Sequence, residues 1–335
     1  MNKKQFKLRV SLLAACAMAG MLLASGPASA ADDIKLGLLS LGGGHWPIWV
    51  TEKEGFFKEE GLNLRKFHTN SIAKAVQALS ANSTDLLYPS NTQATIVAMV
   101  KGAPIKIIAG NFDKALYELI TGPQYKKIED LKGTTFGVIN LTSGSTVLLQ
   151  KILAAHGLHY PKDYSLLTVG GTPARFAAVK KGAVSGAMVT VPTSYMAEDE
   201  GLNILANIST YLPAYQFTVI AGNTGWMKKN RDKTVRFLMA IIKGMRYMND
   251  PKNKEVVIDA AAEAMKLDRK YAVRAYKTVI DGLKAVRNDA APTDVAMETV
   301  IKLEYDRKKL KKLYPPSQFI DNSYREEALK RLDNK

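Results

Sequence analysis

The feature that most restricts the fold is an alternation of short apolar runs with amphipathic stretches, from about residue 34 to residue 223. Apolar runs of four to eight residues are typical of buried strands, and stretches of about ten residues with helical spacing are typical of amphipathic helices. Strands that alternate with helices indicate parallel sheets with helices on both faces. The sequence therefore predicts an α/β protein with doubly wound sheets.

The alternation contains an internal repeat. Residues 74–79 (KAVQAL) precede the run 85–90 (DLLYPS), and about a hundred residues later 175–180 (RFAAVK) precede 185–190 (SGAMVT). Each copy predicts a helix, a tight turn, a strand and a polar turn into another helix. A repeat at this spacing favours two similar α/β lobes over a solenoid.

The individual elements follow from the same pattern. Strands are predicted at residues 34–41, 62–67, 85–88, 105–109, 135–139, 166–169, 187–190, 204–206 and 217–221. Helices are predicted between them at 47–57, 71–81, 92–101, 145–156, 173–181 and 191–200. After Gly225 only helices are expected, at 228–249, 254–265, 269–283 and 293–310. The basic run 307–312 is interpreted as the exposed side of the last of these helices.

The first thirty residues predict an export signal. A basic head precedes an apolar run over residues 10–24, and residues 28–30 (Ala-Ser-Ala) fit the rule for cleavage after Ala30. The apolar run is short for a membrane span. Residues 13–16 (LAAC) also match a lipobox, so lipid attachment at Cys16 is the alternative. Cys16 is the single cysteine of the chain, so the mature protein is expected to contain no disulfide and no cysteine-based site.

The chain is strongly basic. Its formal net charge is +16, and the predicted signal contributes four positive and no negative charges, which leaves +12 for the mature part. Binding to nucleic acid is not expected, because the chain is exported and contains no recognisable motif. Adhesion to an anionic membrane surface and attraction of an anionic solute both remain open, since the field of a whole protein can gather small anions.

Catalytic and metal-binding patterns are weak. The four histidines include no His-Glu-x-x-His pattern, and His156 with His159 is interpreted as a surface pair without a nearby carboxylate. No Gly-x-Ser-x-Gly sequence is present, and Gly42, Gly43 and Gly44 lack the spacing of a dinucleotide-binding loop. The sequence therefore predicts a protein that is not an enzyme and needs neither metal nor cofactor.

Neutral, hydroxyl-rich segments stand where predicted strands end and helices begin. In open parallel sheets, ligands bind outside the carboxyl ends of the strands. Helix N-termini at that edge offer unpaired N–H groups and a partial positive charge, which suit an anion. Ser, Thr and Asn are also ordinary helix N-caps, so each such residue is either a cap or a ligand contact. Their occurrence in both halves, and the excess of hydroxyls over residues 142–146, favour a ligand site.

Several short motifs occur together in a fixed order. They include residues 55–57 (GFF), 60–62 (EGL), 131–133 (LKG), 153–158 (LAAHGL) and 169–175 (VGGTPAR). With the segment from Ala78 to Asp85, they make the chain resemble the nitrate/sulfonate/taurine-type periplasmic solute-binding proteins of ABC importers. That group also contains binders of pyrimidine precursors. The resemblance covers most of residues 34–223.

The resemblance implies a type II periplasmic-binding-protein fold, in which two lobes close on a ligand by hinge motion. Residues 31–117 and 214–335 would form a discontinuous first lobe, and residues 118–213 the second. The crossings would fall near residues 109–117 and 215–222. One departure is clear: such proteins commonly have Gly-x-Val-Asp-Ala in the second half, whereas this chain has Ser185 in place of the aspartate. The position is interpreted as a structural turn.

The family's ligand-contacting loops match, by position, residues 40–46, 69–71, 90–92, 142–146 and 190. Trp46 is expected either to cover a ligand face or to pack in the core. The predicted ligand-binding residues are Ser40, His45, Trp46, Asn70, Ser71, Ser90, Asn91, Thr92, Thr142, Ser143, Ser145, Thr146, Thr172 and Thr190.

The function implied by the resemblance is that of a periplasmic, monomeric receptor. It would deliver a small anion of sulfonate, nitrate or carboxylate type to the transmembrane subunits of an ABC permease. The alternatives are a binder of an aromatic or pyrimidine-like heterocycle, and an enzyme on the same fold. The pyrimidine-synthase relatives use a cysteine-rich motif that this chain lacks, which argues against the enzyme.

Overall fold

Two five-stranded sheets account for the strand pattern of the sequence. The computed structural model describes residues 31–39, 43–69, 71–141 and 143–334. The predicted signal peptide with Cys16, and the predicted ligand residues Ser40, Asn70 and Thr142, lie outside the described residues.

The first sheet contains the chain's early strands and one late strand. Its order is β2 (Leu62–Thr69), β1 (Asp32–Leu39), β3 (Leu86–Asn91), β10 (Thr218–Asn223) and β4 (Ile105–Phe112). β1 is parallel to β2 and β3, and β10 is antiparallel to both of its neighbours. In β3 five consecutive residues are buried, so both faces of the sheet are covered, as expected for a doubly wound sheet.

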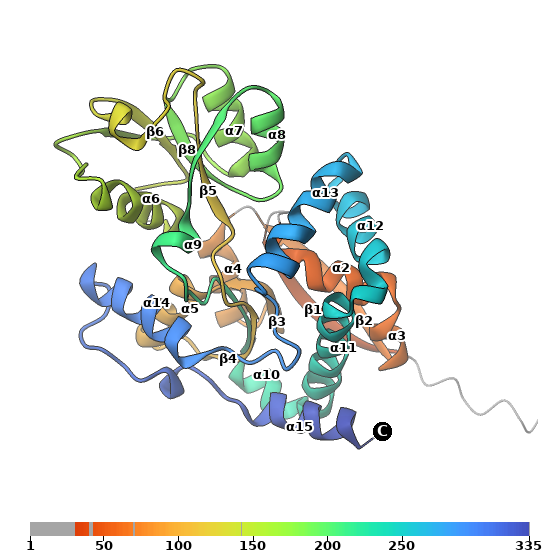
Figure 1. Ribbon diagram of the computed structural model, residues 1–335. Coiled ribbons are helices and arrows are strands. Elements are labelled where there is room, and N and C mark those ends of the chain that lie inside the picture. The colour runs from red at the N-terminus through yellow and green to blue at the C-terminus, as the bar shows by residue number, and fades with distance from the viewer. Residues whose placement is uncertain (1–30, 40–42, 70, 142, 335) are drawn as a thin grey trace, which may run out of the picture.

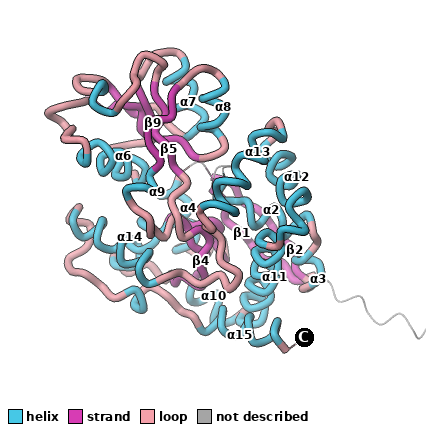
Figure 2. Tube along the Cα trace, viewed as in Figure 1, coloured by secondary structure: helices cyan, strands magenta, loops and turns pink. Residues whose placement is uncertain are grey.

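The second sheet has the same plan. Its order is β7 (Ser165–Thr168), β6 (Thr135–Val138), β8 (Gly186–Thr190), β5 (Tyr117–Thr121) and β9 (Asn203–Asn207). β6 is parallel to β7 and β8, while β5 is antiparallel to β8 and β9. The strands gather in two separate places, each surrounded by helices (Figure 2). The predicted α/β class and the predicted internal repeat are confirmed.

The departure at Ser185 fits a structural turn. Asp85 N–H donates to Lys35 O at 2.8 Å, and Ser185 N–H donates to the corresponding carbonyl of Thr135 at 2.8 Å. The Asp85 carboxylate also accepts from Lys35 N–H at 2.8 Å. The Ser185 hydroxyl instead accepts from Tyr125 Oη at 3.0 Å. The backbone bond is thus the same in both halves, and only the side-chain support differs.

Helices connect the strands and form the end of the chain. Around the sheets lie α2 (Trp46–Lys53), α3 (Phe56–Glu59), α4 (Ile72–Ser80), α5 (Thr92–Val100), α6 (Gly144–Ala155), α7 (Thr172–Lys180), α8 (Thr193–Asp199) and α9 (Ile208–Tyr211). Later come α10 (Thr224–Lys229), α11 (Arg231–Asn249), α12 (Lys254–Met265), α13 (Arg269–Tyr276), a π-helix (Lys277–Gly282), α14 (Asp294–Asp306) and α15 (Ser323–Asp333). Within the described ranges, no helix has both the length and the apolar character to cross a membrane.

We use lobe 1 for the first sheet, its helices and α10 to α15, and lobe 2 for the elements from β5 to α9. In Figure 1 lobe 2 lies above lobe 1, and α12 and α13 rise beside the junction. The chain crosses between the lobes at residues 113–116 and returns at 212–217. The lobe boundaries after residues 117 and 213 stay a prediction.

The structure corrects the interpretation of the basic run 307–312. This run does not lie on a helix face, because α14 ends at Asp306. Lys308 adopts a left-handed φ of 57°, and its N–H donates to Tyr305 O at 2.8 Å, as at many helix ends. Leu310 is buried, whereas the lysines of the run are exposed, as predicted. Strand β5 was also not predicted, because the sequence pattern was interpreted there as a crossing.

The contact between α11 and α2 depends on a glycine. Thr51 is buried in α2, and its hydroxyl donates to Pro47 O at 2.7 Å. A methyl group on Gly244 of α11 would lie 2.0 Å from Thr51 Oγ1. The two helices therefore approach more closely than a larger residue at position 244 would allow.

We expect Gly244→Ala to lower the free energy of unfolding by about 1–3 kcal/mol, because overpacking forces the helices apart. That loss should exceed the gain in helix propensity of about 1 kcal/mol. Urea denaturation measures the change, and the double variant with Thr51→Ala should recover part of it. An unchanged midpoint would contradict this account of the α2–α11 contact.

Candidate ligand-binding site

A polar cleft lies where helix N-termini of the two lobes approach each other. It encloses about 260 Å³ of space not filled by atoms, part of it open to solvent. The starts of α4 and α5 contribute from lobe 1, the start of α6 contributes from lobe 2, and both crossings complete it. The lining consists of Ile72, Asn91, Gln93, Tyr117, Ile139, Ser143, Gly144, Ser145, Leu148, Tyr215 and Phe217.

Helix caps build the lobe 1 side of the cleft. Ser71 caps α4 by accepting from Lys74 N–H at 3.3 Å. Asn91 caps α5 by accepting from Ala94 N–H at 2.9 Å through Oδ1. Asn91 both caps its helix and lines the cleft. Here a cap and a ligand contact are compatible, since the cap uses one oxygen of the side chain.

A cluster of hydroxyls forms the start of α6. Ser143 caps this helix by accepting from Thr146 N–H at 3.3 Å. Its Oγ also lies 3.2 Å from Ser145 Oγ and 2.8 Å from Thr146 Oγ1. Thr146 donates to Asn140 O at 2.7 Å, so its hydroxyl holds the preceding loop. Ser143 and Ser145 are the members of the cluster that line the cleft.

Arg175 stands directly behind this cluster. It lies on α7 and is 1% exposed. Its Nη1 donates to Ser145 Oγ at 3.1 Å, and its Nη2 donates to Thr172 Oγ1 at 3.1 Å. The Tyr117 side chain lies close enough to interact electrostatically with the guanidinium. Its Nε has no hydrogen-bond partner, and no carboxylate of the described residues pairs with it.

Arg175 is therefore a buried positive charge without a counterion in the described part of the chain. Burial lowers the pKa of the Arg175 guanidinium, and the Tyr117 hydroxyl opposes that shift. Arginine nevertheless stays protonated in proteins. An isolated charge in an apolar environment is strongly unfavourable unless an opposite charge compensates it. An anion in the cleft would supply that charge.

The guanidinium also orients the hydroxyls in front of it. Arginine can only donate, so Ser145 and Thr172 accept its hydrogen bonds with their hydroxyl oxygens. The Ser145 hydrogen is then available to the cleft or to Ser143. Burial raises the pKa of Tyr215, which also stays a donor. The arrangement presents hydrogen-bond donors to whatever occupies the cleft.

A buried polar chain supports the opposite wall. Gln93 Nε2 donates to Glu304 Oε1 at 2.8 Å, and Arg307 Nη1 donates to the same oxygen at 2.6 Å. A methyl group on Gly144 would lie 1.9 Å from Gln93 Oε1, so the lobes meet closely here. Tyr117 packs edge-on against Phe217 at a ring distance of 5.3 Å, which joins the two crossings.

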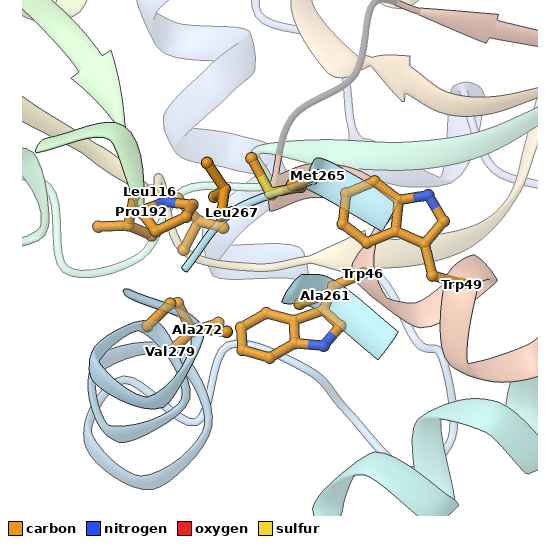
Figure 3. A pocket seen from close by; sticks show the side chains of 12 residues that line it. Trp46, Trp49, Leu116, Pro192, Ala261, Met265, Leu267, Ala272 and Val279 are labelled. Atoms are coloured by element: carbon orange, nitrogen blue, oxygen red, sulfur yellow. The ribbon is translucent and has the colours of Figure 1, made fainter. Parts of the chain in front are cut away.

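Trp46 does not line the polar cleft. It lines a second cavity, here called the apolar pocket, with Trp49 and Leu116 among its neighbours (Figure 3). Trp46 is 2% exposed, and its Nε1 donates to Val257 O at 2.8 Å. His45 is buried and stacks on Trp49 at a ring distance of 5.8 Å.

The remaining predicted residues lie beside the cleft and outside its lining. Ser90 is buried, with its hydroxyl 2.6 Å from Thr95 Oγ1. Thr92 is buried in α5, Thr172 holds Arg175, and Thr190 pairs with Tyr117 at the end of β8. The structure thus brings Asn91, Ser143 and Ser145 together in the cleft, and Ser71 directly precedes Ile72 of the lining.

The sequence interpretation missed Arg175, Tyr117 and Gln93. A signal for Arg175 was present: no acidic residue occurs between Asp163 and Glu198, so the arginine has no local partner. Gln93 and Tyr117 carried no such signal, because their roles depend on how the lobes pack.

His156 is not a member of a histidine pair. Its Nδ1 lies 2.8 Å from Glu129 Oε1, and its Nε2 lies 2.8 Å from Tyr211 Oη. The expectation that no carboxylate lies near His156 was therefore wrong, because Glu129 is brought close from a distant turn. Over the described part of the chain, no group of three or more His, Cys, Asp or Glu residues could hold a metal.

Comparison with known proteins identifies the family to which the chain belongs. Residues 43–254 match the model of a family described as NMT1/THI5 like. YtlA of Bacillus subtilis, which is named as a binding protein, is 25% identical over 222 residues, or 63% of this chain and 64% of YtlA. THI5 of Saccharomyces cerevisiae, a 4-amino-5-hydroxymethyl-2-methylpyrimidine phosphate synthase, is 22% identical over 222 residues. The match covers 61% of this chain and 63% of THI5. The chain spans less than two thirds of either relative.

Solved structures share the architecture. The periplasmic nitrate-binding protein NrtA of Synechocystis PCC 6803 has a TM-score of 0.75 at 15% identity, over 91% of this chain and 90% of NrtA. The periplasmic aliphatic sulphonate binding protein SsuA of Escherichia coli has a TM-score of 0.65 at 17% identity, over 88% of this chain and 99% of SsuA. The predicted periplasmic-binding-protein fold is confirmed.

We expect Arg175→Met to leave the free energy of unfolding unchanged or to raise it, when measured by urea denaturation in anion-poor buffer. The substitution replaces an uncompensated buried charge with an apolar side chain. The matched control is Arg236→Met, which removes hydrogen bonds to Asp32 and Asp232 and should cost about 1–3 kcal/mol. An equal loss in both variants would show that Arg175 is compensated within the protein.

Proposed function

The chain belongs to the NMT1/THI5-like family, and from that premise we propose that it is the substrate-binding component of an ABC importer. It captures a small anionic solute, organic or inorganic, of sulfonate, nitrate or carboxylate type. The two lobes close on the solute and later release it to the transmembrane permease subunits. The protein acts in the periplasm as a monomer, after cleavage of the export signal at Ala30.

The observation that carries this proposal is the buried charge of Arg175. The guanidinium has no counterion among the described residues and lies behind the Ser145 hydroxyl of the cleft lining. The N-terminus of α6 adds a partial positive charge of about half an elementary charge at the same place. One acid group in the cleft would compensate the guanidinium and accept the hydroxyl donors. A neutral or cationic solute would do neither.

Contacts of α8 in lobe 2 with α13 and the following π-helix in lobe 1 support closure. Lys270 pairs with Asp199 at 2.6 Å, and Arg274 pairs with Asp199 at 3.4 Å. Tyr195 Oη donates to Thr278 Oγ1 at 2.6 Å. Ion pairs exposed to this degree contribute about 1 kcal/mol or less each, so the lobes can separate again. The crossings at residues 113–116 and 212–217 are the proposed hinges.

The alternatives come from the same relatives. The yeast family members are named as synthases, so an enzyme on this fold, or a binder of a pyrimidine-like heterocycle, is the second candidate. The Arg175 charge favours an acid over a neutral heterocycle. Incubation of the mature protein with candidate heterocycles, followed by mass spectrometry, would reveal turnover if the chain were an enzyme.

We expect the melting temperature of the mature protein to rise with at least one acid from a panel of nitrate, alkanesulfonates and carboxylates, since binding stabilises the folded state. Arg175→Met should weaken binding of that acid by about tenfold or more in calorimetry, because the variant removes the charge that compensates the acid, and about 1.4 kcal/mol of lost attraction is a factor of ten. Ser145→Ala should weaken it less.

The control for this experiment is Arg325→Met, which removes an arginine of α15 that is far from the cleft lining. It should bind the acid as the unmodified protein does. Equal affinity of the Arg175→Met variant would contradict the proposed anion site. A shift produced by neutral pyrimidines and by no acid would favour the heterocycle binder.

A further inference from the structure

A basic segment, residues 305–314, begins in the last turn of α14 and belongs to the lining of neither cavity described above. Asp306 is its one acidic residue, and no other occurs before Asp321. In Figure 1 the chain between α14 and α15 forms an outer edge of lobe 1, below α6. The positive charges of the segment are Arg307, Lys308, Lys309, Lys311 and Lys312.

The acidic groups beside the segment are already paired. Asp306 accepts from Lys302 Nζ at 3.2 Å. Glu304 is buried and accepts from Gln93 at 2.8 Å and from Arg307 at 2.6 Å. The four lysines of the segment are exposed, and no carboxylate of the described residues forms an ion pair with any of them. Their charges therefore face the solvent uncompensated.

Buried anchors fix the backbone of the segment. The left-handed conformation of Lys308 ends α14, and Leu310 then enters the core with 4% of its surface exposed. Tyr314 packs edge-on against the buried Phe319 at a ring distance of 5.7 Å. Because Leu310 lies between two pairs of lysines and points inward, the lysines are displayed together on the outside of a fixed turn.

Large apolar side chains are exposed among these lysines. Leu313 is 57% exposed and Tyr305 is 41% exposed. Lys312 Nζ lies 5.2 Å from the centre of the Tyr314 ring. At a membrane surface, leucine and aromatic rings enter the boundary of the acyl chains, while lysines keep their ammonium groups among the headgroups. The combination distinguishes this segment from a run that is only charged.

We propose that the basic segment docks the protein on the surface of an anionic lipid bilayer. The four lysines contact the headgroups, and Leu313 inserts at the boundary of the acyl chains. Each lysine near such a surface strengthens binding by about fivefold. Salt screens this attraction over about 8 Å at physiological ionic strength. The contact is therefore reversible, unlike that of a membrane-spanning helix.

The place of the segment relates docking to the polar cleft. Gln93 lines the cleft and donates to Glu304, and Arg307 of the segment donates to the same oxygen. A docked receptor would hold its cleft close to the bilayer that carries the permease. Only this consequence rests on the proposed function, because docking itself requires no solute.

The test is co-sedimentation of residues 31–335 with protein-free vesicles, made of phosphatidylcholine alone or of equal parts of phosphatidylcholine and phosphatidylglycerol. Residues 1–30 are left out because the apolar run 10–24 would bind lipid by itself. We expect binding to the anionic vesicles alone, and weaker binding at high salt. Leu313→Ser should weaken it by about fivefold. The combination of Lys308→Gln, Lys309→Gln, Lys311→Gln and Lys312→Gln should weaken it by about a hundredfold or more.

Matched controls separate a local docking surface from the net charge of the whole protein. Leu167→Ser changes another leucine, 47% exposed on β7 of lobe 2, and should bind the vesicles as the unmodified protein does. Urea denaturation checks that every variant keeps its stability. The charge control loses four exposed lysines of lobe 2 and should keep most of the affinity; it combines Lys126→Gln, Lys151→Gln, Lys162→Gln and Lys181→Gln.

Two outcomes would overturn the docking proposal. An equal loss of affinity in the two fourfold lysine variants would show that the net charge of the protein attracts it to the vesicles. Absence of binding to the anionic vesicles would leave an acidic protein surface as the partner of the segment. Neither outcome affects the proposed function, which depends on the binding of an acid in the polar cleft.

Discussion

The parallel order of the central strands is the constraint on which the rest of the structure depends. Because β1, β2 and β3 run in one direction, their carboxyl ends meet at one edge of the first sheet, and β6, β7 and β8 do the same in the second. The helices that follow begin at those edges. The chain crosses twice between the sheets, so the two edges face each other. A cleft lined by helix N-termini is a consequence of this topology.

Within that cleft, one uncompensated charge sets the chemistry. Arg175 forms hydrogen bonds to neutral hydroxyls and has no acidic partner in the described ranges. By contrast, the half-buried cations Arg236 and Lys243 are paired with the carboxylates of Asp32 and Glu60. The contrast is informative, because a protein gains no stability from an unpaired buried charge. A ligand that supplies the missing charge explains why the arginine is tolerated there.

The C-terminal helices extend this argument to closure. α12 and α13 complete lobe 1 and, with the loop after β8, enclose an apolar space beside the first crossing. Ion pairs between α13 and α8 connect this segment to lobe 2. One helical segment therefore contacts lobe 2 and lines the apolar pocket. Closure of the lobes would then depend on this segment.

Much of the fold could be predicted from the sequence, because helix and strand periods are local. The repeat, most of the succession of strands and helices within each half, and the helical tail were predictable, and so were the caps Ser71, Asn91 and Ser143. Strand β5 was not, since its short run (Tyr117–Thr121) contains the buried Glu118 and resembles a connection. The end of α14 was missed because it depends on the left-handed conformation of Lys308.

The candidate site, like the fold, could be predicted from the sequence only in part. The sequence by itself determined which loops carry hydroxyls and that Arg175 has no acidic neighbour along the chain. Only the tertiary structure decided that this guanidinium points to Ser145, that Gln93 meets Gly144 across the junction, and that Trp46 belongs to a separate apolar pocket. The physical reason is that residue types record local propensity. The partner of a buried charge and the empty space beside a ring depend on how distant segments pack.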